Sequence, residues 1–330
     1  AAAAAPYASA SPMQPRRLLV LGDSISTGYG LAETSERYGD LLAETLGISG
    51  AAYVNMAVDG AKSLDLAAAL QEDAMRNAVG EAELIILSIG GNDVISAFVE
   101  IAKLQDPTVT DIRGAVMVFA AMPQATLQAL FSGTEAQAIL QRTGQNYALH
   151  LGEILNAIRA ANPEARVVLL NQYNPLEGVL LGAALNVYLD AAVVQLNDTT
   201  AAAAEAAGAE AADLYTGFAG NTSQYVNISA LDIHPTAAGH AEIARIVAEM
   251  LKSYSRSAAV KASYVPGADG GTVWLPIDSK FPGDTYAHLQ DAQASGDAQA
   301  VENAHHALEL VLRAEAKDIR EKYVEPPYTT

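Results

Sequence analysis

The segment Arg17-Leu18-Leu19-Val20-Leu21-Gly22-Asp23-Ser24 decides the fold that we expect for this chain. Residues 17–21 form a short apolar run typical of a buried strand, and Gly22 then releases the backbone into a turn. We therefore expect Ser24 just past a strand end. Because open α/β sheets bind ligands outside the carboxyl ends of their strands, a serine there points into the crevice where a substrate lies. Taken alone, the same residues also fit the cap of a following helix.

Two later segments repeat this pattern of a strand followed by polar residues. Ala52-Tyr53-Val54-Asn55 is a β-rich run that precedes Gly60, whose missing Cβ lets its amide approach a bound atom. Residues 84–89 are typical of a central parallel strand, and Gly90-Gly91-Asn92-Asp93 follows. Asn92 offers a neutral N–H donor that can stabilise an oxyanion. Taken separately, Gly60 fits an ordinary turn and residues 90–93 fit a loop with an Asx turn.

A fourth segment supplies a histidine. His234 precedes Pro235, which suits the first turn of a helix predicted over residues 236–251. This leaves His234 exposed on the preceding loop. Its place at a loop-to-helix junction favours a catalytic role over the structural role of most single histidines. A serine, two kinds of oxyanion donor and a general base are together what acyl transfer by a serine hydrolase requires.

With these four segments in this order, the chain from about residue 16 to residue 252 resembles the SGNH hydrolases, also called the GDSL esterase/lipase family. The resemblance implies that Ser24 is the nucleophile and that its amide is one donor of the oxyanion hole. It implies that Gly60 and Asn92 complete the hole and that His234 is the general base. Tyr173-Asn174-Pro175 also resembles members with lipase or esterase activity.

The chain departs from the family pattern at the third member of the triad. The family usually has an aspartate three residues before its histidine, where this chain has Leu231, and Asp232 stands two before. Proline at 235 biases His234 toward extended backbone, in which residues two apart project to the same side. We therefore expect Asp232 to reach Nδ1 of His234. The alternatives are a backbone carbonyl or another carboxylate in that place, with Asp232 as a turn residue.

Strands alternate with helices along the chain, which predicts βαβ units and a mainly parallel sheet. The resemblance implies a three-layer α/β/α, flavodoxin-like fold with a five-stranded parallel sheet, helical insertions and a C-terminal helical extension. The expected strands lie near residues 17–21, 52–55, 84–89, 166–170 and 209–214. Two helical insertions, 94–132 and 176–189, leave the sheet on the side expected for Ser24. Their apolar residues, such as Phe119 and Met122, are expected either to line an acyl pocket or to pack in a helix core.

The chain is predicted to have three parts: residues 1–15 as an unstructured leader or mature N-terminus, 16–253 as the hydrolase domain, and 254–330 as an extension that is helical from about 297. The leader favours a secreted or periplasmic protein, and the alternative is a cytoplasmic protein that starts at Met13.

The extension's apolar stripe fits docking on the core, capping of the site or dimerisation. His305 and His306 diverge by about 100° on a helix, so no metal site is expected.

Composition narrows the function further. The net charge of −19, from 38 acidic and 19 basic residues, argues against nucleic acid and weakly against polyanionic substrates. No apolar run approaches the roughly 20 residues of a membrane span, and the absence of cysteine excludes thiol catalysis. No nucleotide fingerprint is present, so we expect no cofactor.

We therefore expect hydrolysis of a small-molecule or lipid ester, with a carbohydrate O-deacetylase as the first alternative and a non-catalytic binding protein as the second. The sequence does not indicate the oligomeric state.

Overall fold

The structure, a computed structural model, describes residues 15–178, 183–228, 232–261, 264–266 and 272–274, together with residues 301, 305, 308 and 311. The chain divides into two compact units, residues 13–251 and residues 1–12 with 252–330. The predicted leader lies almost wholly outside the described residues. Of the helix predicted from about 297, the four described positions are helical and the rest lies outside. The predicted boundary after residue 253 stays a prediction.

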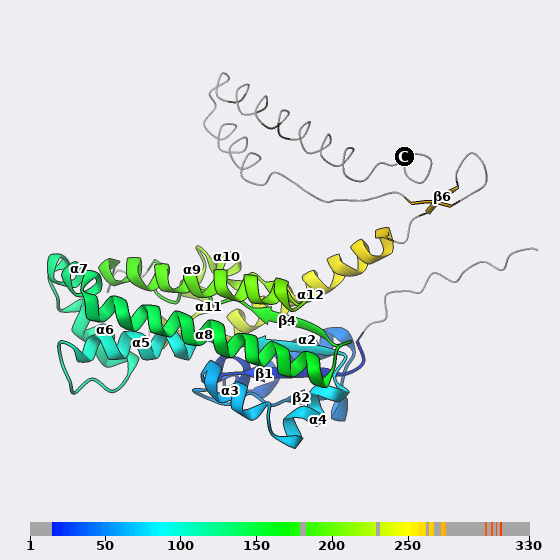
Figure 1. Ribbon diagram of the computed structural model, residues 1–330, viewed down its shortest axis with the longest axis horizontal. Coiled ribbons are helices and arrows are strands. Elements are labelled where there is room, and N and C mark those ends of the chain that lie inside the picture. Colours follow the sequence, from blue (N-terminus) through cyan, green and yellow to red (C-terminus); the bar gives the residue numbers. More distant parts are fainter. Residues whose placement is uncertain are drawn as a thin grey trace, which may run out of the picture. The chain divides into compact units, whose positions relative to one another are not determined.

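A five-stranded sheet lies at the centre of the larger unit (Figure 1). Its strands are β1 (Leu18–Gly22), β2 (Tyr53–Asn55), β3 (Leu84–Ser88), β4 (Arg166–Leu170) and β5 (Glu210–Ala212). All four strand pairs are parallel, and the order is β2-β1-β3-β4-β5. This is the flavodoxin-like order, in which the chain reverses direction across the sheet between β1 and β3. The predicted α/β fold with five parallel strands is confirmed.

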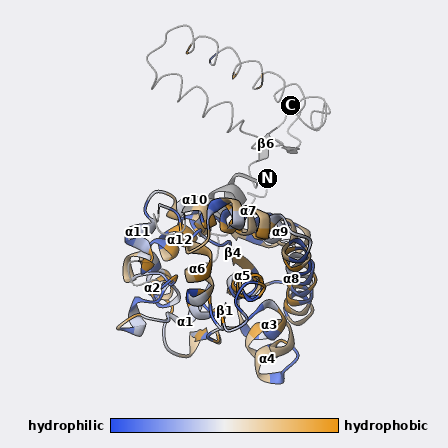
Figure 2. Cartoon of the chain, turned by 90° about the vertical axis from the view of Figure 1, so that its left-hand side faces the viewer, coloured by the Kyte–Doolittle hydropathy of each residue, from blue (hydrophilic) through white to orange (hydrophobic). Residues whose placement is uncertain are grey.

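Helices cover both faces of this sheet, because its central strands are apolar on both sides. Leu19 and Leu21 of β1 belong to one hydrophobic core, and Leu18 and Val20 to the other. Figure 2 shows α2 and α12 on one side of the strands and α3 and α8 on the other. The helices on the second face are α3 (Ser63–Ala69), α4 (Asp73–Glu81), α5 (Gly91–Lys103), α6 (Ile112–Ala120), α7 (Gln124–Ser132), α8 (Thr134–Ala161) and α9 (Ala183–Ala206).

Fewer helices cover the first face in the described part of the chain. It is covered by α1 (Ser24–Thr27), α2 (Tyr38–Leu46), α10 (Leu214–Phe218) and α12 (Ala237–Lys261), and α11 (Thr222–Tyr225) precedes the loop that leads into α12. Two short 3₁₀ turns, η1 (Thr34–Glu36) and η2 (Gly50–Ala52), lie before α2 and before β2. In the smaller unit, the described part contains one antiparallel pair, β6 (Tyr264–Pro266) with β7 (Thr272–Trp274). No helix in the described part of the chain is both long and apolar enough to cross a membrane.

The turn after β1 requires glycine. Gly22 has φ +139°, and a Cβ built on it would lie 2.0 Å from the carbonyl oxygen of Ser88 on β3. Because the two strands lie so close here, the backbone N–H of the next residue, Asp23, donates to Ser88 O at 3.2 Å. The end of β1 is thereby held tightly against β3, and the backbone turns directly into α1 and Ser24.

Candidate active site

The predicted site residues converge at the point where the sheet order reverses. Ser24 is the first residue of α1, directly after β1, and Asn92 is the second residue of α5, directly after β3. Because β1 and β3 are hydrogen-bonded neighbours, the two side chains start from adjacent carboxyl ends. His234 reaches the same place from the loop before α12, which is packed on one face of the sheet. This is the crevice in which open α/β sheets bind ligands.

Ser24, His234 and Asp232 form a continuous chain of side-chain contacts. His234 Nε2 lies 2.9 Å from Ser24 Oγ, and His234 Nδ1 lies 2.5 Å from Asp232 Oδ1. Because an ionised carboxylate can only accept, Nδ1 carries the proton in this arrangement and Nε2 is free to accept from Ser24. Asp232 Oδ1 also accepts the backbone N–H of His234 at 3.1 Å. Leu231, the position where the family usually has aspartate, lies outside the described residues.

The loop that carries His234 is held by neighbours on both sides. The carbonyl oxygen of His234 accepts from Asn227 N at 3.0 Å, and Tyr173 OH donates to Ile233 O at 2.7 Å. Tyr29 covers the imidazole, with the two ring centroids 4.6 Å apart. The imidazole is therefore restrained by its carboxylate, by its backbone and by an aromatic ring.

The predicted oxyanion donors, unlike the triad side chains, are largely without hydrogen-bond partners in the described structure. Within the described part of the chain, the backbone N–H groups of Ser24 and Gly60 donate no hydrogen bond. Asn92 Nδ2 donates one hydrogen bond, at 3.0 Å to the carbonyl oxygen of Ala61 next to Gly60. A side-chain amide carries two N–H bonds, so the second remains for a ligand. One bond fixes the orientation of Asn92 while the other donors stay unpaired.

A partly buried polar cluster ties the two oxyanion segments together. Asp93 Oδ1 accepts from Ser63 Oγ at 2.6 Å, and Asp93 Oδ2 accepts from Ser63 N at 3.0 Å. His150 Nδ1 from α8 lies 3.0 Å from the same Ser63 hydroxyl. Ser63 is fully buried and begins α3, three residues after Gly60. The cluster therefore fixes the spacing between the Gly60 loop and Asn92.

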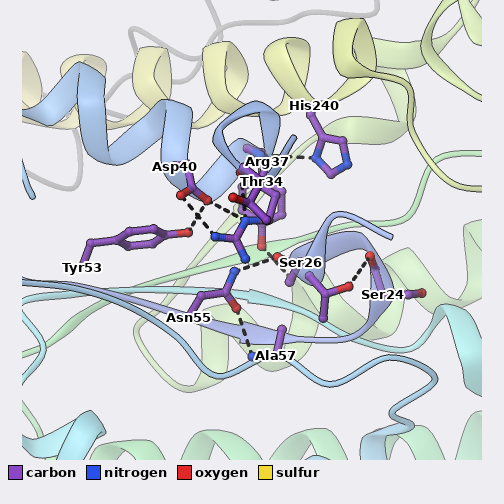
Figure 3. A network of polar contacts seen from close by, with 11 residues as sticks. Ser24, Ser26, Thr34, Arg37, Asp40, Tyr53, Asn55, Ala57 and His240 are labelled. Atoms are coloured by element: carbon purple, nitrogen blue, oxygen red, sulfur yellow. Dashed lines mark hydrogen bonds and ion pairs between the residues drawn. The ribbon is translucent and has the colours of Figure 1, made fainter. Parts of the chain in front are cut away.

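A second network, drawn in Figure 3, supports the Ser24 turn from behind. Asn55 Nδ2 donates to Ser26 O at 2.8 Å, and Asn55 Oδ1 accepts from Ala57 N at 3.0 Å. Ser26 Oγ lies 2.7 Å from Tyr38 OH. Tyr38 N in turn donates to Nδ1 of the buried His240 at 3.3 Å. Burial and the charge of His234 lower the pKa of His240 to about 4, so its ring is neutral near pH 7.

Asp23 lies buried beneath the nucleophile, with 1% of its surface exposed. Its Oδ1 accepts from Ile25 N at 3.1 Å, which caps the short helix that begins at Ser24. Burial raises the pKa of Asp23 to about 7, with smaller contributions in the same direction from the charges of Asp93 and Asp59. Asp23 is therefore a structural neighbour of Ser24 whose charge changes near neutral pH.

Two cavities meet at the catalytic residues and share Asn92 and His234. The inner pocket, a narrow cavity of about 60 Å³, lies between α5 and α9. Its apolar walls are Ile25, Val94, Ile95, Pro175, Leu189, Val193, Leu196 and Ile233. Ser24 opens into this pocket. An apolar cavity with a few polar groups at one end is typical of a site for a small apolar ligand.

The outer pocket is wider and more polar, about 630 Å³ on the same measure. It lies on the other side of Asn92 and His234 and is lined from α5, from the segment before α3 and from the start of α6. The charged residues that line it are Lys62, Glu100, Lys103, Asp111 and Asp232.

The expectation that Phe119 and Met122 line the acyl pocket is wrong. Phe119 is 1% exposed and packs against Phe98 and Phe131, with ring centroids 6.3 and 5.3 Å apart. Met122 packs against the same core. Neither lines the inner pocket, which takes its walls from the start of α5 and the middle of α9. Of the two alternatives for Phe119, the structure supports helix core.

Several residues of the site were not singled out from the sequence. Asp93 follows Asn92 in the sequence, and Asn55 ends a predicted strand. The sequence does not indicate what either side chain contacts. The sequence gives no signal that places Tyr29, His150, Lys62 or Lys103 at the site. In the described part of the chain, no group of three or more acidic or histidine side chains is arranged to bind a metal.

Comparisons with known proteins show the family of the chain and relatives of its fold. Residues 20–242 match the model of the GDSL-like lipase/acylhydrolase family, so the chain belongs to that family of acyl hydrolases. A phospholipase A1 from Streptomyces albidoflavus has a similar fold, with a TM-score of 0.53 and 21% identity over 71% of this chain and 99% of that chain. An extracellular lipase from Streptomyces rimosus has a TM-score of 0.52 and 22% identity over 71% of this chain and 98% of that chain.

A short stretch resembles a protein of a different kind. Over 58 residues the chain is 47% identical to DNA recombination protein RmuC homologs from two strains of Xylella fastidiosa. The match covers 18% of this chain and only 13% of the length of those curated relatives.

Proposed function

We propose that the chain hydrolyses carboxylic acyl esters through an acyl-enzyme on Ser24. The observation that carries the proposal is the continuous contact from Ser24 Oγ through His234 to Asp232, next to unpaired N–H donors. A serine hydroxyl is a weak nucleophile that a hydrogen-bonded base can activate. Family membership supports acyl transfer, and a serine, a histidine and amide donors are the groups that this reaction uses.

In the proposed mechanism, Ser24 Oγ attacks the carbonyl carbon of the ester while its proton passes to His234 Nε2. The negative charge moves onto the carbonyl oxygen, where the N–H groups of Ser24, Gly60 and Asn92 stabilise it. The bond to the alcohol oxygen then breaks, and that oxygen takes the proton from His234. A water molecule repeats the sequence on the acyl-enzyme and releases the acid.

Asp232 has two tasks in this mechanism. Its hydrogen bond to Nδ1 selects the tautomer that leaves Nε2 free, and its charge stabilises the imidazolium that forms during proton transfer. The second contact, from the backbone N–H of His234 to the same oxygen, holds the carboxylate in line with the ring.

The inner pocket supports an acyl group larger than acetyl. Its walls are aliphatic side chains from α5 and α9, directly beside Ser24. A carbohydrate O-deacetylase has little use for such a pocket, because the acyl group of its substrate is acetyl, which carries only a methyl beyond the carbonyl. We therefore assign the inner pocket to the acyl chain and the outer pocket to the alcohol.

Ser24→Ala tests the assignment of the nucleophile. Hydrolysis of p-nitrophenyl esters of increasing chain length, with acetylated xylan alongside, measures activity, and labelling by a fluorophosphonate reports the reactive serine. Removing a serine nucleophile elsewhere costs about 10⁶ in kcat, so we expect near-complete loss of both signals. Ser49→Ala is the control for labelling, because Ser49 is exposed and its side chain makes no cap hydrogen bond, so its loss should leave the labelling unchanged. Substantial turnover by Ser24→Ala protein that keeps its circular dichroism spectrum would refute the proposal.

A further inference from the structure

The inner pocket has polar groups beside its aliphatic walls. Of the described side chains that line it, three are polar without belonging to the proposed catalytic set: Asp23, Gln172 and Tyr173. The hydroxyl of Tyr173 is engaged, because it donates to Ile233 O at 2.7 Å. The carboxyl of Asp23 and the side-chain amide of Gln172 therefore remain as polar groups that an acyl chain in this pocket would meet.

Gln172 lies just after β4 and is held there by its backbone. Its N–H donates to Asn197 Oδ1 at 2.7 Å, and its carbonyl oxygen accepts from Asn197 Nδ2 at 2.8 Å. The side-chain amide takes no part in this anchoring. Its Nε2 donates to Ile89 O at 3.5 Å, which leaves Oε1 on the other side of the amide as an acceptor.

This acceptor has no donor. Gln172 is 7% exposed, yet its Oε1 accepts no hydrogen bond in the described part of the chain. The described side-chain atoms that are both fully enclosed and unpaired are Ser88 Oγ and His240 Nε2. Gln172 Oε1 is not one of them, so it borders open space, and the cavity that Gln172 lines is the inner pocket. The pocket therefore presents an unpaired amide oxygen to its ligand.

A second oxygen lies near the first. A Cβ built on Gly91, the first residue of α5, would lie 3.2 Å from Gln172 Oε1 and 3.9 Å from Asp23 Oδ2. The other oxygen of Asp23, Oδ1, caps α1. Because Gly91 has no side chain, the space between the two oxygens stays open. Asp23 and Gly91 are the chain neighbours of Ser24 and Asn92, so this space adjoins the place proposed for the ester carbonyl.

We propose that the acyl group of the substrate carries a hydroxyl on its second or third carbon, which Gln172 Oε1 and Asp23 Oδ2 bind in the inner pocket. The proposal rests on the proposed ester hydrolysis and specifies its substrate class, a hydroxyacyl ester. A purely aliphatic chain would leave the amide oxygen buried without a donor, which is costly. The cavity of about 60 Å³ exceeds the roughly 10–15 Å³ that one water needs, so it admits more than a solvent molecule.

A hydroxyl fits this pair of oxygens better than an ammonium group does. Burial raises the pKa of Asp23 to about 7, so both its neutral and its charged form are present near neutral pH. A hydroxyl both donates and accepts, and it can pair with the carboxyl in either form. An ammonium group would lose its hydration among aliphatic side chains, which is costly without a full opposite charge.

The test compares methyl esters that share a six-carbon acyl chain. The kcat/KM of wild type is measured by pH-stat titration for methyl hexanoate and for its 2-hydroxy, 3-hydroxy and 6-hydroxy derivatives, with single enantiomers of the first two. Each value is divided by the rate of alkaline hydrolysis of that ester, which corrects for intrinsic reactivity. We expect one enantiomer of the 2-hydroxy or 3-hydroxy ester to be preferred over hexanoate about two- to tenfold. The 6-hydroxy ester should be worse than hexanoate, because its hydroxyl would meet the aliphatic walls.

Two variants remove the proposed contact by different routes. Gln172→Met keeps the length of the side chain and the backbone anchor but removes the oxygen. Gly91→Ala places a methyl group in the space between the two oxygens. In both, we expect the preference for the hydroxy ester over hexanoate to be lost. The matched control is Gln195→Met, an exposed position on α9 outside the inner pocket, whose preference should equal that of wild type.

Three results would contradict the proposal. Wild type that hydrolyses hexanoate as well as every 2-hydroxy and 3-hydroxy ester, or a preference that survives in folded Gln172→Met and Gly91→Ala proteins, overturns the hydroxyl site and leaves ester hydrolysis intact. Methyl 3-aminohexanoate preferred over the 3-hydroxy ester also overturns it, because the two oxygens would then bind a cation. Hydrolysis of none of these esters, nor of the p-nitrophenyl esters, overturns both proposals.

Discussion

The two sides of the candidate active site are organised in opposite ways. On the proton-transfer side, Ser24, His234 and Asp232 contact one another directly, at 2.9 and 2.5 Å. On the oxyanion side, the N–H groups of Ser24 and Gly60 have no partner in the described structure, and Asn92 is held from behind by Ala61. Proton transfer requires groups in contact before the substrate arrives, whereas charge stabilisation requires donors that are fixed but unpaired. The two sides should therefore fail differently when mutated.

The largest effect is expected on the proton-transfer side, at Asp232. Asp232→Asn keeps the size of the side chain but removes the charge that holds the Nδ1–H tautomer of His234. The corresponding change in a serine protease costs about 10⁴ in kcat, and we expect a loss of about 10²–10⁴ near neutral pH. Steady-state kinetics on a p-nitrophenyl ester measures it. A kcat/KM within about threefold of wild type would mean that another group orients the imidazole.

Asn92→Ala is the next largest change and tests the oxyanion side. Loss of one oxyanion donor elsewhere costs about 10²–10³ in kcat, or roughly 3–4 kcal/mol. Because the donor acts on charge that develops in the transition state, we expect KM to change little. The kcat and KM of the variant are measured separately on the same ester. A defect confined to KM would instead make Asn92 a substrate-binding residue and would remove the contrast between the two sides.

The sequence indicated candidate residues for both sides of the site, but not the groups that hold the oxyanion side in place, for physical reasons. Strand ends, a serine after a glycine turn and a histidine before proline are local signals, and Asp232 follows from its spacing to His234. Ser63 and His150 are 87 residues apart, and no local pattern indicates that they meet. Phe119 lies on an apolar helix face, but periodicity shows only that such a face is buried. What it packs against depends on α7 and α5, which the sequence does not place.

A smaller effect is expected at Asp93, which supports the oxyanion side without belonging to it. Asp93→Asn puts an N–H donor opposite one of the two donors of Ser63, so the start of α3 should shift. Misplacement of catalytic groups by about 1 Å can cost up to 10² in rate, and we expect kcat to fall about tenfold with KM little changed. Asp65→Asn is the control, because Asp65 holds the same helix start through Lys62 N without contacting Ser63. An equal loss in both variants would make the effect one of helix stability alone.

The smallest effect on turnover, and a distinct effect on stability, is expected at Asp23, which lies beneath Ser24. Its pKa is raised by burial from 3.8 to about 7, and the charge of Asp93 adds to the shift. The folded protein therefore binds a proton that the unfolded chain releases above about pH 4. The stability from this proton is fully present below pH 3.8 and is lost as the pH rises through about 7, at up to about 1.4 kcal/mol per pH unit.

The variant Asp23→Asn tests this, because asparagine keeps the acceptor for Ile25 N but cannot ionise. Urea unfolding at pH 4.5, 5.5 and 6.5 should show Asp23→Asn gaining stability relative to wild type with each step. Parallel curves for the two proteins would show that Asp23 is already ionised in the fold, with a charge beneath the nucleophile throughout this range.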